Sequence, residues 1–220
     1  MGTWAWEISA RFYRRTYGPL AHGLDEAVFA RVGDVDGAVV ADVGCGPGVV
    51  TRKLLERGVA RVYAVDVSPR MLAQVPDDPR VEKVRARLED DPLARLGEDA
   101  LDLVIFKRSL YLPRPLALRA LRSARRTLRP GGAIAVVHPE ASVVAYAFGR
   151  PSRLRRHTAY HLFNRGISTL GVLLGGEDYG VYTRAELAAL LEEAADGARV
   201  EVSDGGEGAF NLGIVWGSAG

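Results

Sequence analysis

The chain of 220 residues is poor in cysteine and in long apolar segments. Cys45 is the single cysteine, so an internal disulfide and a zinc site built from several cysteines are both excluded. The N-terminal stretch MGTWAWEISARFYRRTYG has no apolar centre of the kind that signal peptides carry. No stretch is long and apolar enough to span a bilayer. We therefore expect a soluble, cytoplasmic protein with no membrane partner.

The chain also lacks an excess of charge of one sign. It has 29 basic and 27 acidic residues, and its formal net charge is +2. A domain that binds nucleic acid usually carries a strongly basic surface, so we expect no nucleic-acid partner. Hydrophobic residues make up 48% of the chain, which is typical of a globular protein with a sizeable core. We expect one domain over 1–220, and whether it forms a homodimer stays open.

Short apolar runs alternate with helix-like segments through the first two thirds of the chain. The predicted strands are 38–43, 61–66, 81–85, 101–106 and 133–138. The predicted helices between them are 49–57, a short one that begins after Ser68 and Pro69, and 115–129. Alternation of this kind favours a parallel sheet with crossover helices.

The alternation stops after the fifth predicted strand. Residues 139–182 are rich in arginine, histidine and aromatic residues and form an insertion in the pattern. A helix is predicted over 184–195, with Thr183 and Glu186 placed as a capping box. Two further runs, 198–203 and 209–216, predict an antiparallel pair of strands.

These elements together predict the fold class. We expect a doubly wound α/β fold with a mostly parallel seven-stranded sheet, an antiparallel C-terminal edge pair and helices on both faces. Residues 1–30 precede the first strand and are expected to form a helical cap.

A glycine-rich loop follows the first predicted strand. It reads Gly44-Cys45-Gly46-Pro47-Gly48 and leads directly into a helix. Glycine permits the sharp turn and lets a ligand approach the backbone, and the helix N-terminus suits a carboxylate. Asp66 ends the second strand about 20 residues further on, where an acidic residue accepts hydrogen bonds from ribose hydroxyls. The alternative is a bare turn, with Asp66 capping a helix.

The spacing of the glycines argues against a dinucleotide. A dinucleotide-binding loop needs glycine at the position of Val49. The stretch VADVGCGPGVVTRKL instead resembles motif I of the class I S-adenosylmethionine (SAM)-dependent methyltransferases. The stretches YAVDVSPRML, LDLVIFKRSLYL and LRPGGAIAVV are similar to later segments of that family, in the same order. The resemblance covers about residues 35–140 and implies a SAM-dependent methyltransferase with SAM as its cofactor.

The resemblance also implies which residues bind the cofactor. Those expected around its methionine part are Tyr13 or Tyr17, Asp42, Gly44, Cys45 and Gly46, and Phe106 would touch SAM through its backbone. Asp66 would hold the ribose, with Val67 and Met71 beside the adenine. One departure is Arg87, which stands where many relatives have an aspartate that contacts the adenine amino group. That contact then depends on the Leu88 backbone or on Glu89.

The residues that act on the methyl acceptor are harder to identify. His138 follows the fifth strand and has the chemistry of a general base, and Tyr111 lies where relatives place substrate contacts. For both, a simple packing or loop role is the alternative. His157 and His161 are four residues apart and would share one helix face, as a solvated or a substrate-facing pair. No third metal ligand is identifiable, so we expect no metal.

The resemblance implies a small-molecule acceptor and favours secondary metabolism as its setting, because small-molecule enzymes of the family usually build a substrate lid where this chain has the insertion 139–182. The position after the fourth strand reads Phe106-Lys107-Arg108-Ser109, which lacks the Asn/Asp-Pro-Pro-aromatic motif of enzymes that methylate amino groups of bases. The alternatives are a SAM-binding enzyme that catalyses a rearrangement or cyclisation, an RNA or protein methyltransferase, and a nicotinamide oxidoreductase.

Overall fold

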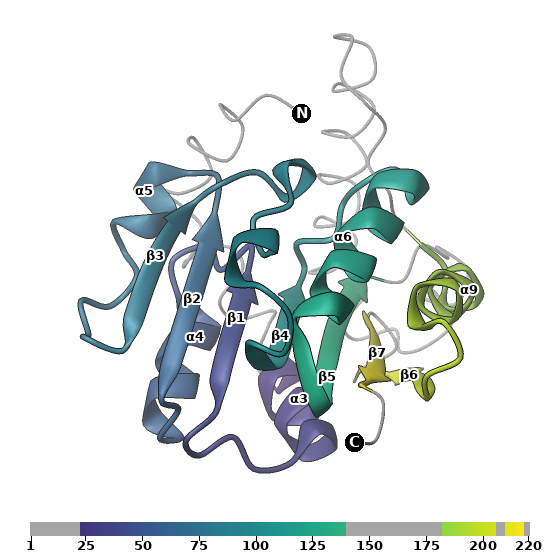
Figure 1. Ribbon diagram of the computed structural model, residues 1–220, viewed down its shortest axis with the longest axis horizontal. Helices are drawn as coiled ribbons and strands as arrows, with labels where there is room; N and C mark the ends of the chain where they lie inside the picture. Colours follow the sequence, from purple (N-terminus) through teal and green to yellow (C-terminus); the bar gives the residue numbers. More distant parts are fainter. Residues whose placement is uncertain (1–22, 140–181, 206–209, 218–220) are drawn as a thin grey trace, which may run out of the picture.

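A seven-stranded sheet forms the centre of the computed structural model, which describes residues 23–139, 182–205 and 210–217 (Figure 1). The strands are β1 (Val39–Val43), β2 (Arg61–Asp66), β3 (Val81–Arg85), β4 (Leu101–Lys107), β5 (Leu128–Pro139), β6 (Val200–Asp204) and β7 (Phe210–Trp216). Their order in the sheet is β3-β2-β1-β4-β5-β7-β6. The chain adds β2 and β3 on one side of β1 and then crosses back to place β4 on the other side, so the strand order reverses at β1.

The direction of the strands confirms the predicted fold class. Strands β1 to β5 pair in parallel, and β7 pairs antiparallel with both β5 and β6. The carboxyl ends of β1, β2 and β4 meet at one edge, because the register aligns Val43 with Val65 and Asp42 with Ile105. Ligands of doubly wound sheets bind at this edge, next to the point where the strand order reverses.

Helices cover both faces of the sheet, as the sequence predicts (Figure 1). The helices are α3 (Leu24–Val32), α4 (Val49–Glu56), α5 (Pro69–Leu72), α6 (Arg114–Thr127) and α9 (Arg184–Ala195), with short 3-10 helices η2 (Leu88–Asp90) and η3 (Ala94–Leu96). Within the described residues, no helix is long and apolar enough to cross a membrane.

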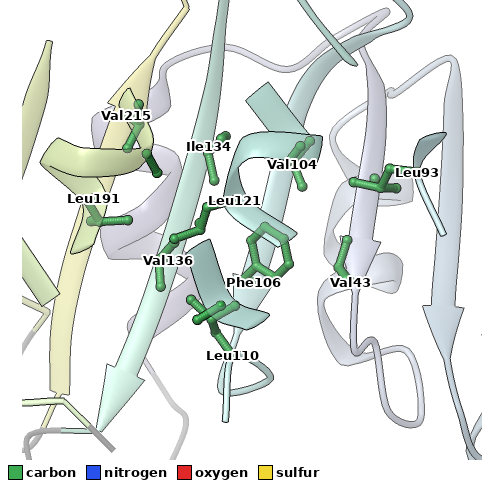
Figure 2. Packing of buried hydrophobic residues seen from close by; sticks show 14 of the residues in the cluster. Val43, Leu93, Val104, Phe106, Leu110, Leu121, Ile134, Val136, Leu191 and Val215 are labelled. Atoms are coloured by element: carbon green, nitrogen blue, oxygen red, sulfur yellow. The ribbon is translucent and has the colours of Figure 1, made fainter. Parts of the chain in front are cut away.

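One face of the sheet packs against α6 and α9. Figure 2 shows Phe106 of β4 and Val136 of β5 beside Leu121 of α6, with Leu191 of α9 in the same apolar cluster. Neighbouring residues in a strand point to opposite faces, so Phe106 of β4 belongs to this core and Ile105 to the opposite one. This first core fixes the carboxyl end of β4 through the side chain of Phe106.

The opposite face packs against α3 and α4. Ile105 of β4 and Val137 of β5 contribute to this second core, together with Val28 of α3 and Leu54 of α4. Because α4 begins directly after the glycine loop, its packing fixes the loop against the sheet.

Local capping explains where two helices begin. The Ser68 side chain accepts a hydrogen bond from the Met71 backbone N–H at the start of α5. Thr183 and Glu186 form the capping box predicted for α9. Each cap satisfies backbone N–H groups that have no partner within the helix.

The fifth strand differs from its predicted bounds. The sequence predicts a helix to residue 129 and a strand over 133–138, whereas α6 ends at Thr127 and β5 begins at Leu128. Leu128 is buried and pairs with Leu101, and the register shifts before Leu103. Pro130 disfavours helical backbone at the residue before it, so the helix ends early and an irregular strand begins.

Leu121 provides a test of the first core. It is fully buried at 0% exposure on α6, whereas Leu118 on the same helix is only partly buried. Leu121→Ala removes buried apolar surface and leaves a cavity, so we expect the free energy of unfolding to fall by about 2–5 kcal/mol. Urea denaturation measures this loss. Leu118→Ala changes helix propensity by the same amount but removes less buried surface, so its free energy of unfolding should fall clearly less. Equal losses would contradict the packing described for α6.

Candidate functional site

The glycine loop is held by backbone hydrogen bonds to β2. The N–H groups of Gly44 and Cys45 both donate to the Val65 carbonyl oxygen, at 2.7 and 3.0 Å. The Gly46 N–H donates to Asp66 Oδ2 at 2.9 Å. The loop therefore lies across the carboxyl ends of β1 and β2 in a fixed conformation.

Two glycines of the loop are required by close packing as well as by backbone conformation. Gly44 has a φ of +71°, and a Cβ atom there would lie 2.2 Å from Ser109 Cβ. Gly48 has a φ of +76°, and its Cβ would lie 3.1 Å from Val75 Cα and Pro76 Cδ. Positive φ values strain residues that carry a Cβ. Neighbouring protein atoms occupy the space that a side chain at either glycine would need. A ligand would therefore contact the loop through its other backbone groups.

Asp66 connects the loop to the segment after β2. Besides Gly46, its carboxylate accepts a hydrogen bond from the Ser68 N–H, at 2.9 Å from Oδ1. The residue is 9% exposed, at the edge where β2 ends. Each carboxylate oxygen can accept more than one hydrogen bond, so these contacts are compatible with ribose hydroxyls as further donors.

Asp42 lies beneath the loop and contacts α4. Its Oδ2 accepts a hydrogen bond from Thr51 Oγ1 at 2.7 Å, and the carboxyl group is buried. Burial raises the pKa of Asp42 to about 6, although the Thr51 hydrogen bond and the nearby Lys107 charge both favour the ionised form. Its side chain holds the end of β1 against α4.

A buried ion-pair cluster lies next to Asp42. Asp25 at the start of α3 pairs with Lys107 at the end of β4, and its second oxygen lies 3.0 Å from Lys53 Nζ on α4. Burial lowers the pKa of Lys107, whereas the charge of Asp25 acts to raise it. This cluster fixes the start of α3 over the carboxyl end of the sheet.

The side chains of Cys45 and Phe106 are buried within the protein. Cys45 is 7% exposed and packs with Leu72 and Val75, and burial raises the pKa of its thiol. Phe106 is 1% exposed and belongs to the first core. Any cofactor contact of these two residues is therefore made by the backbone, which for Phe106 is the expected kind.

The residues expected around the adenosine line the same edge of the sheet. Val67 follows Asp66 and is half-buried, and Met71 of α5 is 2% exposed. Leu88 and Glu89 lie in η2, just beyond the carboxyl end of β3. The Glu89 carboxylate pairs with Arg87 at 3.2 Å, so Arg87 partly neutralises it.

At the end of β5, the ring of His138 lies between those of two tyrosines. It is 0% exposed, and its ring centroid lies 5.5 Å from that of Tyr111 and 5.2 Å from that of Tyr182. Its Nδ1 lies 2.9 Å from the Pro139 carbonyl oxygen. The structure thus brings together the two residues that the sequence suggests as catalytic, and adds Tyr182.

Ser109 connects the two sides of the site. Its hydroxyl donates to the Val43 carbonyl oxygen at 2.5 Å, and its carbonyl accepts from the Tyr111 N–H at 2.9 Å. Arg108, just before it, has a left-handed backbone with a φ of 57°. The sequence prediction missed Ser109, because a serine after a strand carries no signal of a contact with a glycine loop.

Some predicted site residues lie outside the described part of the chain: Tyr13, Tyr17, His157 and His161. Among the residues that are described, no group of three or more histidine, cysteine, aspartate or glutamate side chains is arranged to hold a metal ion.

The raised pKa of Asp42 makes stability depend on pH. Its folded-state pKa of about 6 lies above the ordinary value of 3.8, so the folded state binds the proton more tightly than the unfolded state. Stability from this group is present below pH 3.8 and is lost as pH rises to about 6. At about 1.4 kcal/mol per pKa unit, the loss is on the order of 3 kcal/mol.

We expect Asp42→Asn to remove this dependence, because the amide stays neutral and can still accept from Thr51. The measurement is urea denaturation of both proteins at several pH values between 4 and 7. The difference in the free energy of unfolding between wild type and variant should change over this pH range. A difference that stays constant with pH would contradict the assignment to Asp42.

Comparison with known proteins gives a match to one family model. Residues 40–132 match the family model described as "Methyltransferase domain". The match spans β1 to the start of β5, and so includes the glycine loop, Asp66 and Ser109.

Two curated relatives have different acceptors in their names. Ribosomal protein L11 methyltransferase of Methylococcus capsulatus is 31% identical over 53% of this chain and 40% of its own length. Trans-aconitate 2-methyltransferase of Enterobacter sp. is 33% identical over 58% of this chain and 53% of its own length. The chain thus spans about half, or less, of the length of these relatives.

Solved structures share the fold. A SAM-dependent methyltransferase from Aquifex aeolicus superposes with a TM-score of 0.58 at 20% identity, over 90% of this chain and 92% of that one. At this identity the likeness shows the shared fold. Residues 40–132 are therefore similar to a methyltransferase domain, and the chain shares the fold of a solved SAM-dependent methyltransferase.

Proposed function

We propose that this chain transfers the methyl group of SAM to a small-molecule acceptor. The observation that carries the proposal is the hydrogen bond from Ser109 Oγ to the Val43 carbonyl oxygen. It joins the strand end that precedes the glycine loop to the segment that carries Tyr111, which lies against His138. A cofactor on the loop would thus lie beside the residues suited to hold an acceptor.

The described residues fit SAM in chemistry and in position. The first-turn N–H groups of α4 and its positive dipole end suit the methionine carboxylate. Asp66, held in place by Gly46 and Ser68, is placed to accept hydrogen bonds from the ribose. SAM supplies an activated methyl group on a sulfonium, so the protein has mainly to orient the acceptor and exclude water.

Buried side chains favour exclusion of water on the acceptor side. His138 and Tyr182 are buried, and the Tyr182 hydroxyl donates to the Leu112 carbonyl oxygen at 2.5 Å. These contacts hold the loop after β4 against the segment before α9. We propose that the acceptor binds next to Tyr111, which is only half-buried.

A small-molecule acceptor is favoured over a macromolecular one. The relative from Enterobacter sp. is named for trans-aconitate, a small molecule. The ribosomal protein L11 methyltransferase supports the rival, a protein acceptor. The sequence Phe106-Lys107-Arg108-Ser109 lacks the motif associated with methylation of base amino groups. We therefore place a small molecule first and a protein second.

Calorimetric titration with SAM tests the role of Asp66. Asp66→Ala removes the expected ribose contact and the support of the Gly46 N–H, so we expect affinity to fall by about 10- to 100-fold, the scale of charge-assisted hydrogen bonds. Asp77→Ala is the control, because Asp77 is an exposed aspartate that pairs with Lys83. Unchanged affinity in the Asp66 variant would remove this residue from the cofactor site.

Incubation with methyl-labelled SAM and a panel of small acceptors tests the reaction itself. We expect label in a product together with formation of S-adenosylhomocysteine. Conversion of an acceptor without label in the product would favour a rearrangement or cyclisation instead. Binding of a nicotinamide cofactor without binding of SAM would overturn the proposal entirely.

A further inference from the structure

One arginine side chain bridges the glycine loop and the segment that follows α5. Arg52 lies in α4, four residues after Gly48. Its Nη1 donates to the carbonyl oxygens of Pro47 and Gly48, at 2.8 and 3.1 Å, and its Nη2 donates to the carbonyl oxygen of Gln74 at 2.6 Å. Gln74 lies just beyond the end of α5. The guanidinium therefore holds the last part of the loop at a fixed distance from α5.

The shape of the guanidinium suits this bridge. Arginine presents five N–H donors in one rigid plane, so it can serve acceptors on two segments at once, whereas the lysine ammonium is a single charged point on a flexible stem. A charged donor also makes stronger hydrogen bonds than a neutral one. Arg52 is half-buried, so its bonds are partly shielded from water. A bridge of this kind depends on arginine and is lost with lysine.

Other contacts between the loop and α5 continue the same interface. Asp66 accepts hydrogen bonds from the Gly46 N–H and from the turn that begins α5. Cys45 packs with Val75, which follows α5. Asp66 thus ties the loop to the start of α5, and Arg52 ties it to the end.

The proposed cofactor would contact both of these segments. In the site described above, the first turn of α4 suits the methionine carboxylate and Asp66 suits the ribose. A ligand that spans two segments binds more tightly when their spacing is already correct, because less ordering is needed on binding. Without the bridge, the ligand itself would have to bring the loop and α5 into place.

We infer that Arg52 is a positioning residue for SAM binding: it sets the spacing between the glycine loop and α5. The inference rests on the proposed SAM site. The three acceptors of Arg52 are backbone carbonyl oxygens of the protein, so its effect is assigned to the loop rather than to direct contact with the ligand. Arg52 should therefore matter most for ligands that contact both segments, and least for fragments that contact one.

Calorimetric titration with two ligands tests this role. S-adenosylhomocysteine carries both the adenosine and the amino-acid part, whereas 5′-methylthioadenosine lacks the amino-acid part. Arg52→Met keeps a long side chain and a similar helix propensity but removes the donors. We expect its affinity for S-adenosylhomocysteine to fall by about 10-fold, and its affinity for 5′-methylthioadenosine by less than about 3-fold. An equal fall for the two ligands, or no fall for S-adenosylhomocysteine, would overturn the inference.

Two further variants separate the bridge from charge and from general stability. Arg80→Met is the matched control, because Arg80 donates to the carbonyl oxygens of Leu55 and Val59 near the other end of α4. Its affinity for S-adenosylhomocysteine should equal that of the wild type, and a fall as large as in Arg52→Met would contradict a specific role of Arg52. Arg52→Lys keeps the positive charge but cannot span both segments, so its affinity should fall as in Arg52→Met. Recovery of the wild-type affinity in Arg52→Lys would show that charge alone is enough, against the inference.

Hydrogen exchange of the ligand-free protein gives a test without any cofactor. In Arg52→Met, the Gly46 and Gly48 amides should exchange faster by about 10-fold, because the loop opens more often. The amide of Ile105 in the buried strand β4 should keep its wild-type rate, which shows that the fold is intact. Unaltered rates at both glycines would contradict the inference. Failure of the wild-type protein to bind SAM would instead overturn the proposed function, whatever the exchange rates show.

Discussion

The site depends on one carboxylate at the end of a buried parallel strand. Asp66 accepts backbone hydrogen bonds from Gly46 and Ser68, so it fixes the glycine loop after β1 and the turn into α5 at the same time. Charge-assisted bonds of this kind are stronger than neutral ones, and burial at 9% exposure protects them from water. The same side chain is thus a structural support for the loop and the expected partner of the ribose.

The parallel sheet brings these local contacts together at one edge. Because β1, β2 and β4 run in the same direction, the glycine loop, Asp66 and the segment after β4 all emerge at one end of the sheet. The two cores below this edge hold the strands from both faces. Charged groups at the edge, such as Asp25 and Lys107, are paired rather than solvated. The edge is therefore held in place by the protein's own contacts.

The sequence predicts those parts of the fold and site that have a local signal. Strands such as β1 and β2 are apolar runs, and the loop with Asp66 has a recognisable spacing, so both could be predicted. The start of β5 at Leu128 was missed, because the helical spacing of apolar residues continues through Leu128. Its place in the strand is decided instead by its pairing with Leu101. Arg52 was missed for a similar reason: its bridge to Gln74 depends on how α4 and α5 lie in the fold. Contacts between residues far apart in the chain leave no periodic pattern.

The packing of Ser109 against Gly44 has a consequence for how such a protein can change. The space that a side chain at 44 would need is already occupied by Ser109, which belongs to the acceptor side. Substitutions at these two positions are therefore epistatic: the effect of one depends on the residue at the other. If the acceptor binds beside Tyr111 as proposed, variation in acceptor range is easier at Tyr111 than at Ser109, because a larger residue at 109 would displace the glycine loop. Selection for a new acceptor thus operates under a constraint set by the cofactor.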